Sequence, residues 1–197
     1  MNTIHPRKKL LLAEAAKLFR EKSFEAATLR ELAKRAGIKG GSVYYHFSSK
    51  QEILYNIMDY TLTELTFQLK ESIKTETDFA KKFRKAIETH IIYHINNLDM
   101  TYVTDSEIRS LTQDYYDLIS KKRKRYENIF SEMLEDAIEK GLLNIKNSKL
   151  ATFAILQMCT GVSYWYKNGG PLGVNDIVEV YFEFVYRGLQ GGNIAQE

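Results

Sequence analysis

The sequence predicts an all-α protein of about nine helices, and three observations support this class. Only two prolines occur, Pro6 and Pro171, so most of the chain lacks the strongest helix breaker. The 11 glycines gather mainly around residues 37–41, 161–173 and 188–192, which leaves long segments free to be helical. Apolar residues recur at helical spacing in those segments. With 44% hydrophobic residues among 197, the chain can bury a core.

The first three predicted helices span residues 7–22, 28–36 and 41–47. One apolar stripe of the first consists of Leu11, Ala15, Leu18 and Phe19. The second begins at a capping box, in which Thr28 caps the helix and Glu31 follows three residues later. It ends near Gly37, because glycine accepts the left-handed backbone that closes a helix. In the third helix, Val43 and Phe47 are four residues apart and face inward.

Six further helices are predicted, over residues 49–72, 79–97, 102–110, 112–140, 148–167 and 174–190. A second capping box, from Ser49 to Glu52, begins the first of these six. Gly141 closes the 112–140 helix, and Ser148 caps the next one, which is apolar nearly all round. A turn over residues 168–171 separates the last two helices.

The early helices predict a helix-turn-helix unit over about residues 27–46, because two short helices joined by a glycine turn follow a longer one. The charge distribution agrees with a nucleic-acid partner. Residues 1–50 carry eleven Lys and Arg against four Glu, whereas the net charge of the whole chain is only +3. We therefore expect a DNA-binding domain over residues 4–64 and a second helical domain over residues 65–197.

The outward side chains of the 41–47 helix suit the DNA major groove, because they can hydrogen-bond to phosphates and bases. They are Ser42, Tyr44, Tyr45 and His46. Gly41 lets the backbone approach the DNA closely, and Lys39 and Lys50 flank the helix and can neutralise phosphates. The free N–H groups behind Thr28 offer another phosphate site. Each of four residues also has an alternative role without DNA contact. Thr28 would then only cap its helix and Tyr45 would pack inward. His46 would be a buried structural histidine and Lys50 a solvated lysine.

This segment resembles the TetR family of bacterial repressors over residues 8–58 without a gap. The matching residues are Thr28–Ala33, Gly37, Gly41–Phe47, Lys50, Glu52 and Leu54, and the run Tyr-Tyr-His-Phe-x-x-Lys is the most specific part. The resemblance implies that the DNA contacts are Thr28, Tyr44, Tyr45, His46 and Lys50. It also implies that Val43 and Phe47 belong to the core.

The second domain is expected to dimerise. A helix-turn-helix reads few base pairs alone, so symmetric dimers span two half-sites of a palindromic operator. The last two predicted helices are apolar and suit a four-helix interface between two copies. Candidate interface residues are Phe153, Leu156, Ile177, Tyr181, Val185 and Gly188. The alternative is that both helices are simply part of the core.

Aromatic and polar residues on apolar helix faces also predict a pocket for a small hydrophobic ligand. Candidate lining residues are His90, Tyr93, His94, Tyr115, Ile119, Tyr126, Met158, Val162 and Trp165. For each of them an aromatic-rich core is the alternative. His90 and His94 share one helix face, as metal ligands can, but no nearby Cys or carboxylate completes a metal site at motif spacing. We therefore predict no metal and no cofactor.

Two more segments are similar to the TetR subgroup that regulates fatty-acid and sterol breakdown and that acyl-CoA releases from DNA. The segments are Ser106–Leu111 and Trp165–Leu172, followed by Arg187–Leu189. Lys167 departs from the arginine that the subgroup often has there. The resemblance implies an acyl-CoA or fatty acid effector, whose phosphates the basic run Lys121–Arg125 could bind. A solvated helix surface is the alternative for that run.

The sequence therefore predicts a homodimeric repressor that a small hydrophobic ligand releases from DNA. Alternatives are a drug-responsive repressor of an efflux pump, with Glu88 and Asp105 as acids for cations, and a ligand-free architectural DNA-binding protein. No enzyme is predicted, because no nucleophile–base pair, carboxylate pair or phosphate loop stands at motif spacing. The single Cys159 and the lack of a signal peptide or long apolar segment predict a cytoplasmic protein without membrane contact.

Overall fold

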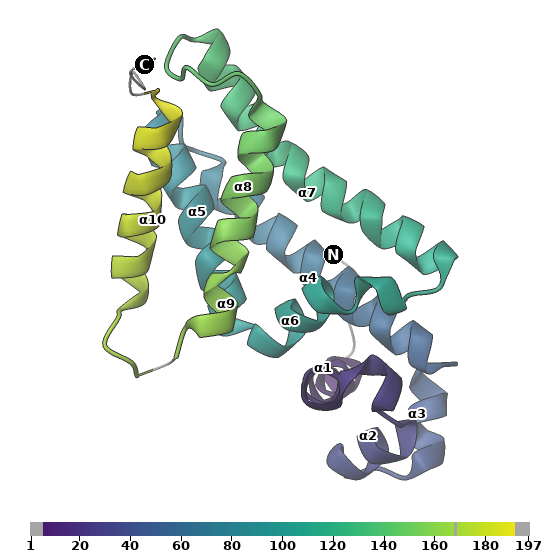
Figure 1. Cartoon of the computed structure of the whole chain (residues 1–197). Helices are drawn as coiled ribbons and strands as arrows, with labels where there is room; N and C mark the ends of the chain where they lie inside the picture. The colour runs from purple at the N-terminus through teal and green to yellow at the C-terminus, as the bar shows by residue number, and fades with distance from the viewer. Residues whose placement is uncertain (1–5, 168, 192–197) are drawn as a thin grey trace, which may run out of the picture. The chain divides into compact units, whose positions relative to one another are not determined.

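The protein is all-α, as its sequence predicts. The computed structural model describes residues 6–167 and 169–191, and in these ranges the chain forms ten α-helices, one 3₁₀ turn and no strand (Figure 1). The tenth helix arises because the predicted 148–167 helix is divided at Gly161. Asn168, in the predicted turn over 168–171, lies outside the described residues. None of the helices described is both long and apolar enough to cross a membrane.

The chain divides into two compact units, each with its own hydrophobic core. One unit contains the residues up to Thr63 together with Asn97–Lys122, and the other contains Glu64–Asn96 and the residues from Arg123 onward. The first unit thus includes a segment from the middle of the chain, which the predicted division at residues 64 and 65 assigns to the second domain. Positions 4, 5 and 192–197 of the predicted domains are outside the described ranges.

The first unit is built from the N-terminal helices and the middle segment. Its elements are α1 (Pro6–Ala26), α2 (Leu29–Arg35), α3 (Gly40–His46), the start of α4 (Lys50–Ile73), α6 (Leu98–Ser106), the 3₁₀ turn η1 (Ile108–Ser110) and the start of α7 (Gln113–Glu139). Residues from α1, α3 and α4 meet in its core, among them Leu12, Phe19, Val43 and Ile57. Helix α6 packs against α1.

Helix α1 is interrupted at Ser23, whose backbone has φ 69° and ψ 160°. A residue other than glycine in this region costs about 1–3 kcal/mol. The predicted end of the first helix at Lys22 therefore falls at the interruption, and a further helical turn follows it. The interruption accompanies the burial of Phe24, whose ring packs edge-on against that of Phe19 with centroids 5.3 Å apart.

The second unit contains the rest of α4 and α7 together with α5 (Phe79–Asn96), α8 (Ser148–Thr160), α9 (Val162–Trp165) and α10 (Val174–Leu189). Helix α5 is central, because it packs against α8, α9 and α10. Large buried residues of this core are Phe83, Ile87, Ile91, Phe130 and Leu134.

The end of α7 and the start of α8 can each be compared with the helix boundary that the sequence predicts. Gly141 follows α7 with φ +70°, and the next amide, that of Leu142, donates to the Ala137 carbonyl at 2.9 Å, so the predicted glycine closure is confirmed. The predicted cap at Ser148 is wrong by one residue. The Asn147 side chain accepts from the Leu150 amide at 2.9 Å, whereas Ser148 Oγ donates to Glu135 at 2.8 Å.

Candidate nucleic-acid interface and candidate effector site

Helix α2 begins at Thr28 with both halves of a capping box. Thr28 Oγ1 accepts from the Glu31 amide at 3.2 Å, and the Glu31 carboxylate accepts from the Thr28 amide at 3.2 Å. Hydrogen bonds from Lys22 and then from Thr28 lower the pKa of Glu31, so its carboxylate is ionised at neutral pH. Thr28 is exposed, but its hydroxyl also donates to Glu31 at 3.1 Å. A DNA phosphate would therefore compete with Glu31 for that hydroxyl hydrogen.

The turn between α2 and α3 has the geometry that the glycine signal predicts. Gly37 has φ +63°, and the amide of Ile38 donates to the Ala33 carbonyl at 3.0 Å. This pattern ends α2 with its last carbonyls bound and sets the direction in which α3 leaves the turn.

Helix α3 has one buried face and one face that is open to solvent. Val43 and Phe47 are fully buried, as predicted. Tyr44 and Tyr45 are 61% and 86% exposed, which is unusual for large aromatic side chains. The Tyr45 ring lies edge-on to the half-buried His46 ring, with centroids 5.1 Å apart.

Open space also surrounds the start of α3. A Cβ atom built at Gly40 or Gly41 would meet no atom within 4 Å, and neither residue has a positive φ. The fold itself therefore does not require glycine at these positions. Close approach of a partner's backbone remains a physical reason for it. Lys39 is exposed and Ser42 half-buried, so both side chains can be reached from this surface.

Lys50, predicted to contact phosphate, has its ammonium group bound within the protein. Its Nζ donates to the carbonyls of Phe24 at 2.8 Å and of Glu25 and Ala27 at 3.1 Å each. An ammonium group has three hydrogens, so these bonds use all its donors. The same group lies 4.5 Å from the centroid of the Phe24 ring. A phosphate contact from Lys50 stays a prediction, and it would require one of these bonds to break.

The capping box predicted from Ser49 to Glu52 is only half formed. Ser49 Oγ accepts from the Glu52 amide at 3.0 Å, but the Glu52 carboxylate accepts from the amide and hydroxyl of Ser48. Partial burial opposes ionisation of Glu52, yet these bonds from Ser48 outweigh it and lower the pKa of the carboxyl group.

In the second unit, four of the predicted pocket residues form a buried cluster. His90 Nδ1 is 2.8 Å from Tyr126 Oη, its Nε2 is 3.0 Å from Thr160 Oγ1, and its ring stacks on that of His94. Tyr93 is buried beside them. Burial, reinforced by His94, lowers the pKa of His90 well below its usual range, so the imidazole is neutral. Burial likewise raises the pKa of the Tyr126 phenol.

Other pocket candidates are distributed differently. Tyr115 and Ile119 belong to the first unit, where Tyr115 stacks on Tyr55 and Ile119 is fully buried in the core. The sequence could not show this division, because both residues share helix α7 with Tyr126. Val162 is buried in the second unit, whereas Trp165 is substantially exposed.

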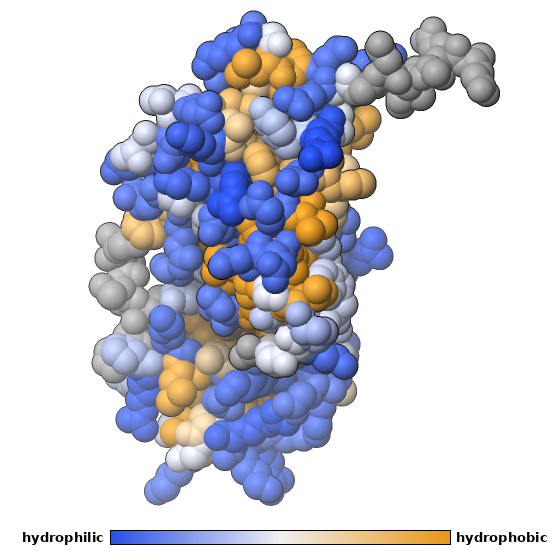
Figure 2. All heavy atoms as spheres, turned by 90° about the vertical axis from the view of Figure 1, so that its left-hand side faces the viewer, coloured by the Kyte–Doolittle hydropathy of each residue, from blue (hydrophilic) through white to orange (hydrophobic). Residues whose placement is uncertain are grey.

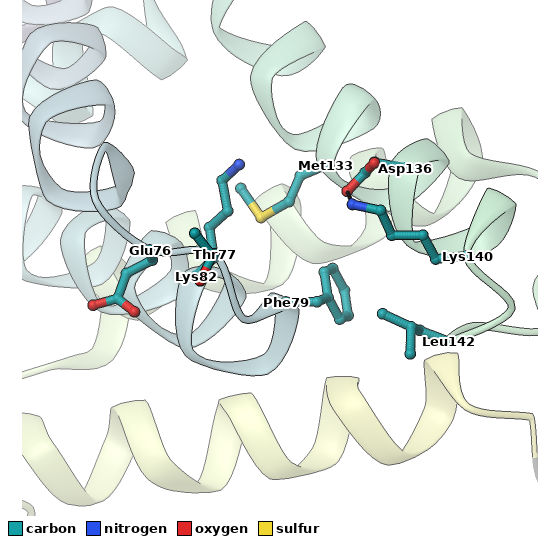
Figure 3. A pocket seen from close by; sticks show the side chains of 8 residues that line it. All are labelled: Glu76, Thr77, Phe79, Lys82, Met133, Asp136, Lys140 and Leu142. Carbon is teal, nitrogen blue, oxygen red and sulfur yellow. Dashed lines mark hydrogen bonds and ion pairs between the residues drawn. The ribbon is translucent and has the colours of Figure 1, made fainter.

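The second unit also contains a hollow of about 290 Å³ that none of the predicted pocket residues lines (Figure 3). Its walls are Glu76, Thr77, Phe79, Lys82, Met133, Asp136, Lys140 and Leu142. On one wall, Lys140 Nζ forms an ion pair with Asp136 Oδ2 at 2.6 Å. Three apolar side chains and five polar or charged ones therefore line this space.

Exposed large hydrophobic side chains occur on α8–α9 and along one face of α10. The residues on α8–α9 are Leu150, Phe153, Tyr164 and Trp165, and those on α10 are Val180 and Phe184. On the side of the molecule that α10 borders, hydrophobic residues lie among hydrophilic ones (Figure 2). We call these six residues the apolar stripe.

The apolar stripe overlaps only partly with the predicted interface residues. Phe153 belongs to it, Gly188 is exposed one turn beyond Phe184, and Leu156 and Tyr181 are half-buried. Ile177 and Val185 are in the core of the unit itself. The predicted interface residues do not include Val180 and Phe184, because Ile177, Tyr181 and Val185 have the same four-residue spacing and the sequence does not show which of the two faces is buried.

Comparison with known proteins assigns both parts of the chain. Residues 11–57 match the family described as bacterial regulatory proteins, tetR family. Residues 76–189 match the family described as tetracyclin repressor-like, C-terminal domain. The chain belongs to the TetR family. It is thus a DNA-binding transcriptional regulator, as its sequence predicts, and its homologues are regulators rather than enzymes.

Three relatives of this TetR-family chain illustrate the match. The transcriptional repressor KstR2 of Mycobacterium tuberculosis is 25% identical over 194 residues, which cover 94% of each chain. The structure of PfmR from Thermus thermophilus has a TM-score of 0.83 and 29% identity, covering 92% of this chain and 99% of that one. The structure of AibR in complex with isovaleryl coenzyme A and operator DNA has a TM-score of 0.84 and 20% identity, covering 91% and 98%.

Proposed function

We propose that the chain is a homodimeric repressor, that α3 binds a palindromic operator, and that a hydrophobic effector, with acyl-CoA or a fatty acid favoured, lowers its affinity for DNA. The observation that carries the proposal is the exposure of Tyr44 and Tyr45 on a helix whose other face is fully buried. Side chains so placed suit the major groove, where α3 can lie as a recognition helix.

The proposed DNA contacts have different functions. The hydroxyl groups of Tyr44 and Tyr45, together with His46, Lys39 and Thr28, would bind phosphates and set the position of α3. Ser42 and the backbone at Gly41 would lie nearest the base edges. Lys50 would act mainly through the carbonyls that it binds, because those bonds use its three donors.

A homodimer is the partner that fits the apolar stripe. Exposed Leu, Phe and Val side chains on α8 and α10, which both pack against α5, lose contact with water when a second copy covers them. Two copies would place two α3 helices in successive major grooves, roughly 34 Å apart. A repressor of this kind would act where bacterial DNA is, in the cytoplasm.

The effector proposal rests on relatives and on charge. AibR was solved with isovaleryl coenzyme A, and KstR2 is called a ketosteroid transcriptional regulator. Within the basic run, Lys122 pairs with Asp59 at 2.5 Å in the first unit, whereas Lys124 and Arg125 are exposed in the second unit. These two cations are our candidates for contacts with coenzyme phosphates.

A binding experiment tests both parts of this proposal. Wild-type protein is used to enrich duplexes from random-sequence DNA, and its affinity for the enriched duplex is measured by fluorescence anisotropy at fixed salt. We expect an inverted-repeat sequence, and a lower affinity when palmitoyl-CoA is added than when coenzyme A alone is added. Enrichment of no sequence would contradict the regulator proposal. An affinity that short, medium and long acyl-CoAs all leave unchanged would contradict the effector proposal alone.

A further inference from the structure

We infer that Glu107 is a positioning residue for DNA binding, because its carboxylate fixes the segment from which α2 and α3 extend. We call this segment, residues 23–27, the α1–α2 corner. The inference rests on the proposed function, since it concerns how the same recognition helix is held. All the residues involved belong to the first unit.

One backbone donor of the corner is bound by a side chain from outside α1. In an uninterrupted helix the amide of Phe24 would donate to the carbonyl four residues earlier. The non-helical backbone of Ser23 interrupts that ladder, and the Phe24 amide donates instead to Glu107 Oε1 at 3.0 Å. The other carboxylate oxygen of Glu107 accepts from Ser110 Oγ at 2.7 Å. A side chain more than eighty residues away thus supplies the missing acceptor.

The carbonyl groups of the same corner are bound from another side. Lys50, at the start of α4, donates to three of them, those of Phe24, Glu25 and Ala27. A carboxylate therefore binds an N–H group of the corner and an ammonium group binds its C=O groups. Charge-assisted bonds of this kind are the stronger class of protein hydrogen bond.

The two sets of bonds are connected through Gln51. The Gln51 amide group donates to the Ser110 carbonyl at 2.6 Å and accepts from the Thr112 amide at 3.1 Å. The α2–α3 segment begins at the corner and ends where α4 begins, so both of its ends are bound to the stretch from Glu107 to Thr112. An ion pair between Arg20 and Asp99 at 2.9 Å adds a second link between α1 and α6.

The hydrogen bond from the Phe24 amide to Glu107 helps to hold the strained backbone conformation of Ser23. Without an acceptor for the Phe24 amide, Ser23 can return to a favoured backbone region, and the direction of the corner changes with it. Moreover, removal of a carboxylate should by charge alone strengthen binding to DNA. A loss of affinity on removal of Glu107 would therefore report the position of α3 and not its electrostatic environment.

Three substitutions separate these effects. Glu107→Ala removes both the charge and the acceptor, and Glu107→Gln removes the same charge but keeps an oxygen that can accept from the Phe24 amide. Glu107→Asp keeps the charge but shortens the side chain, so that the carboxylate no longer reaches the Phe24 amide. This variant tests the same lost bond if the Glu107→Ala protein does not fold. Affinity for the duplex enriched by the wild type is measured by anisotropy, with thermal unfolding of each variant as a check. We expect about 10-fold weaker binding for the alanine and aspartate variants and a change below about 2-fold for glutamine.

Two further measurements test the mechanism directly. Hydrogen exchange of the Phe24 amide should be faster in Glu107→Ala than in wild type and Glu107→Gln. Ser23→Gly, which makes the positive φ accessible without strain, should restore part of the affinity when added to Glu107→Ala. Folded alanine and aspartate variants that bind as tightly as wild type would overturn the inference while leaving the proposed function intact. A wild-type protein that enriches no duplex would instead overturn the proposed function, and the inference with it.

Discussion

The α3 surface and the apolar stripe both expose large side chains, but their chemistry differs. On α3 the exposed groups are tyrosines, whose rings end in hydroxyls, beside glycines and a lysine. On α10 they are Val180 and Phe184, which are 64% and 73% exposed and have no polar atom in the side chain. The first set suits a hydrated, anionic partner such as DNA, and the second suits a dry contact with a second copy. The exposure of large side chains thus indicates a binding partner, and the presence or absence of polar atoms at the ends of these side chains indicates whether that partner is DNA or protein.

The largest effect should follow from a charge placed in the apolar stripe. Phe184→Glu should make the protein monomeric, because a carboxylate buried between two copies would be desolvated without a partner. Operator affinity should then fall on the order of 100-fold or more, since a single DNA-binding domain contacts only one half-site of the operator. Sedimentation velocity and anisotropy measure the two effects. Asn175→Glu places the same charge on another face of α10 and should leave the oligomeric state and the operator affinity unchanged. A dimeric Phe184→Glu protein would show that this surface is not the dimer interface.

A smaller effect is expected on α3. Tyr45→Ala should weaken operator binding about 10-fold through the loss of one contact. It should change the free energy of unfolding by less than about 0.5 kcal/mol, because the side chain is exposed. Anisotropy and urea unfolding test the two expectations. Retention of full affinity by Tyr45→Ala would mean that this tyrosine does not face DNA.

The opposite face of the same helix provides the contrast. Val43→Ala should lower the free energy of unfolding by roughly 2 kcal/mol, because it leaves a cavity in the core of the first unit. Urea unfolding measures this loss. A Val43→Ala protein as stable as Tyr45→Ala would contradict the division of α3 into a core face and a partner face.

The smallest effect concerns pH and the second unit. The pKa of His90 is lowered by burial, so its neutral form contributes stability that is present above about pH 6.5 and is lost as the pH falls below it. The free energy of unfolding should decrease by at most about 1.4 kcal/mol per pH unit there. His90→Gln should flatten this dependence in denaturation curves at pH 7.5 and 5.5. An unchanged slope would show that another group is responsible.

The sequence predicts the parts of the first unit whose causes are local. The capping box at Thr28, the left-handed Gly37 and the inward Val43 and Phe47 each depend on residues within one or two turns. Lys50 could not be interpreted in this way, because its partners are carbonyls more than twenty residues away. The same is true of Ser23 and Glu107, where a strained backbone and its acceptor come from distant segments.

The second unit was harder to interpret for a related reason. Helix α7 contributes to both units, so its aromatic residues Tyr115 and Tyr126 lie in different cores although they look alike in the sequence. On α10, more than half of the residues are apolar or aromatic, and only the packed structure shows that Ile177 and Val185 face the core while Val180 and Phe184 face outward. Composition therefore identified the apolar helices but not which of their faces is free.

Native mass spectrometry of the wild-type protein on its enriched duplex tests the central claim most directly. A homodimeric regulator predicts complexes with two 22.9-kDa chains, or a multiple of two, for each inverted repeat. It also predicts that Phe184→Glu and Tyr45→Ala each reduce the amount of this complex, the former more strongly. A complex with a single chain per duplex, formed equally by wild type and Phe184→Glu, would contradict the account.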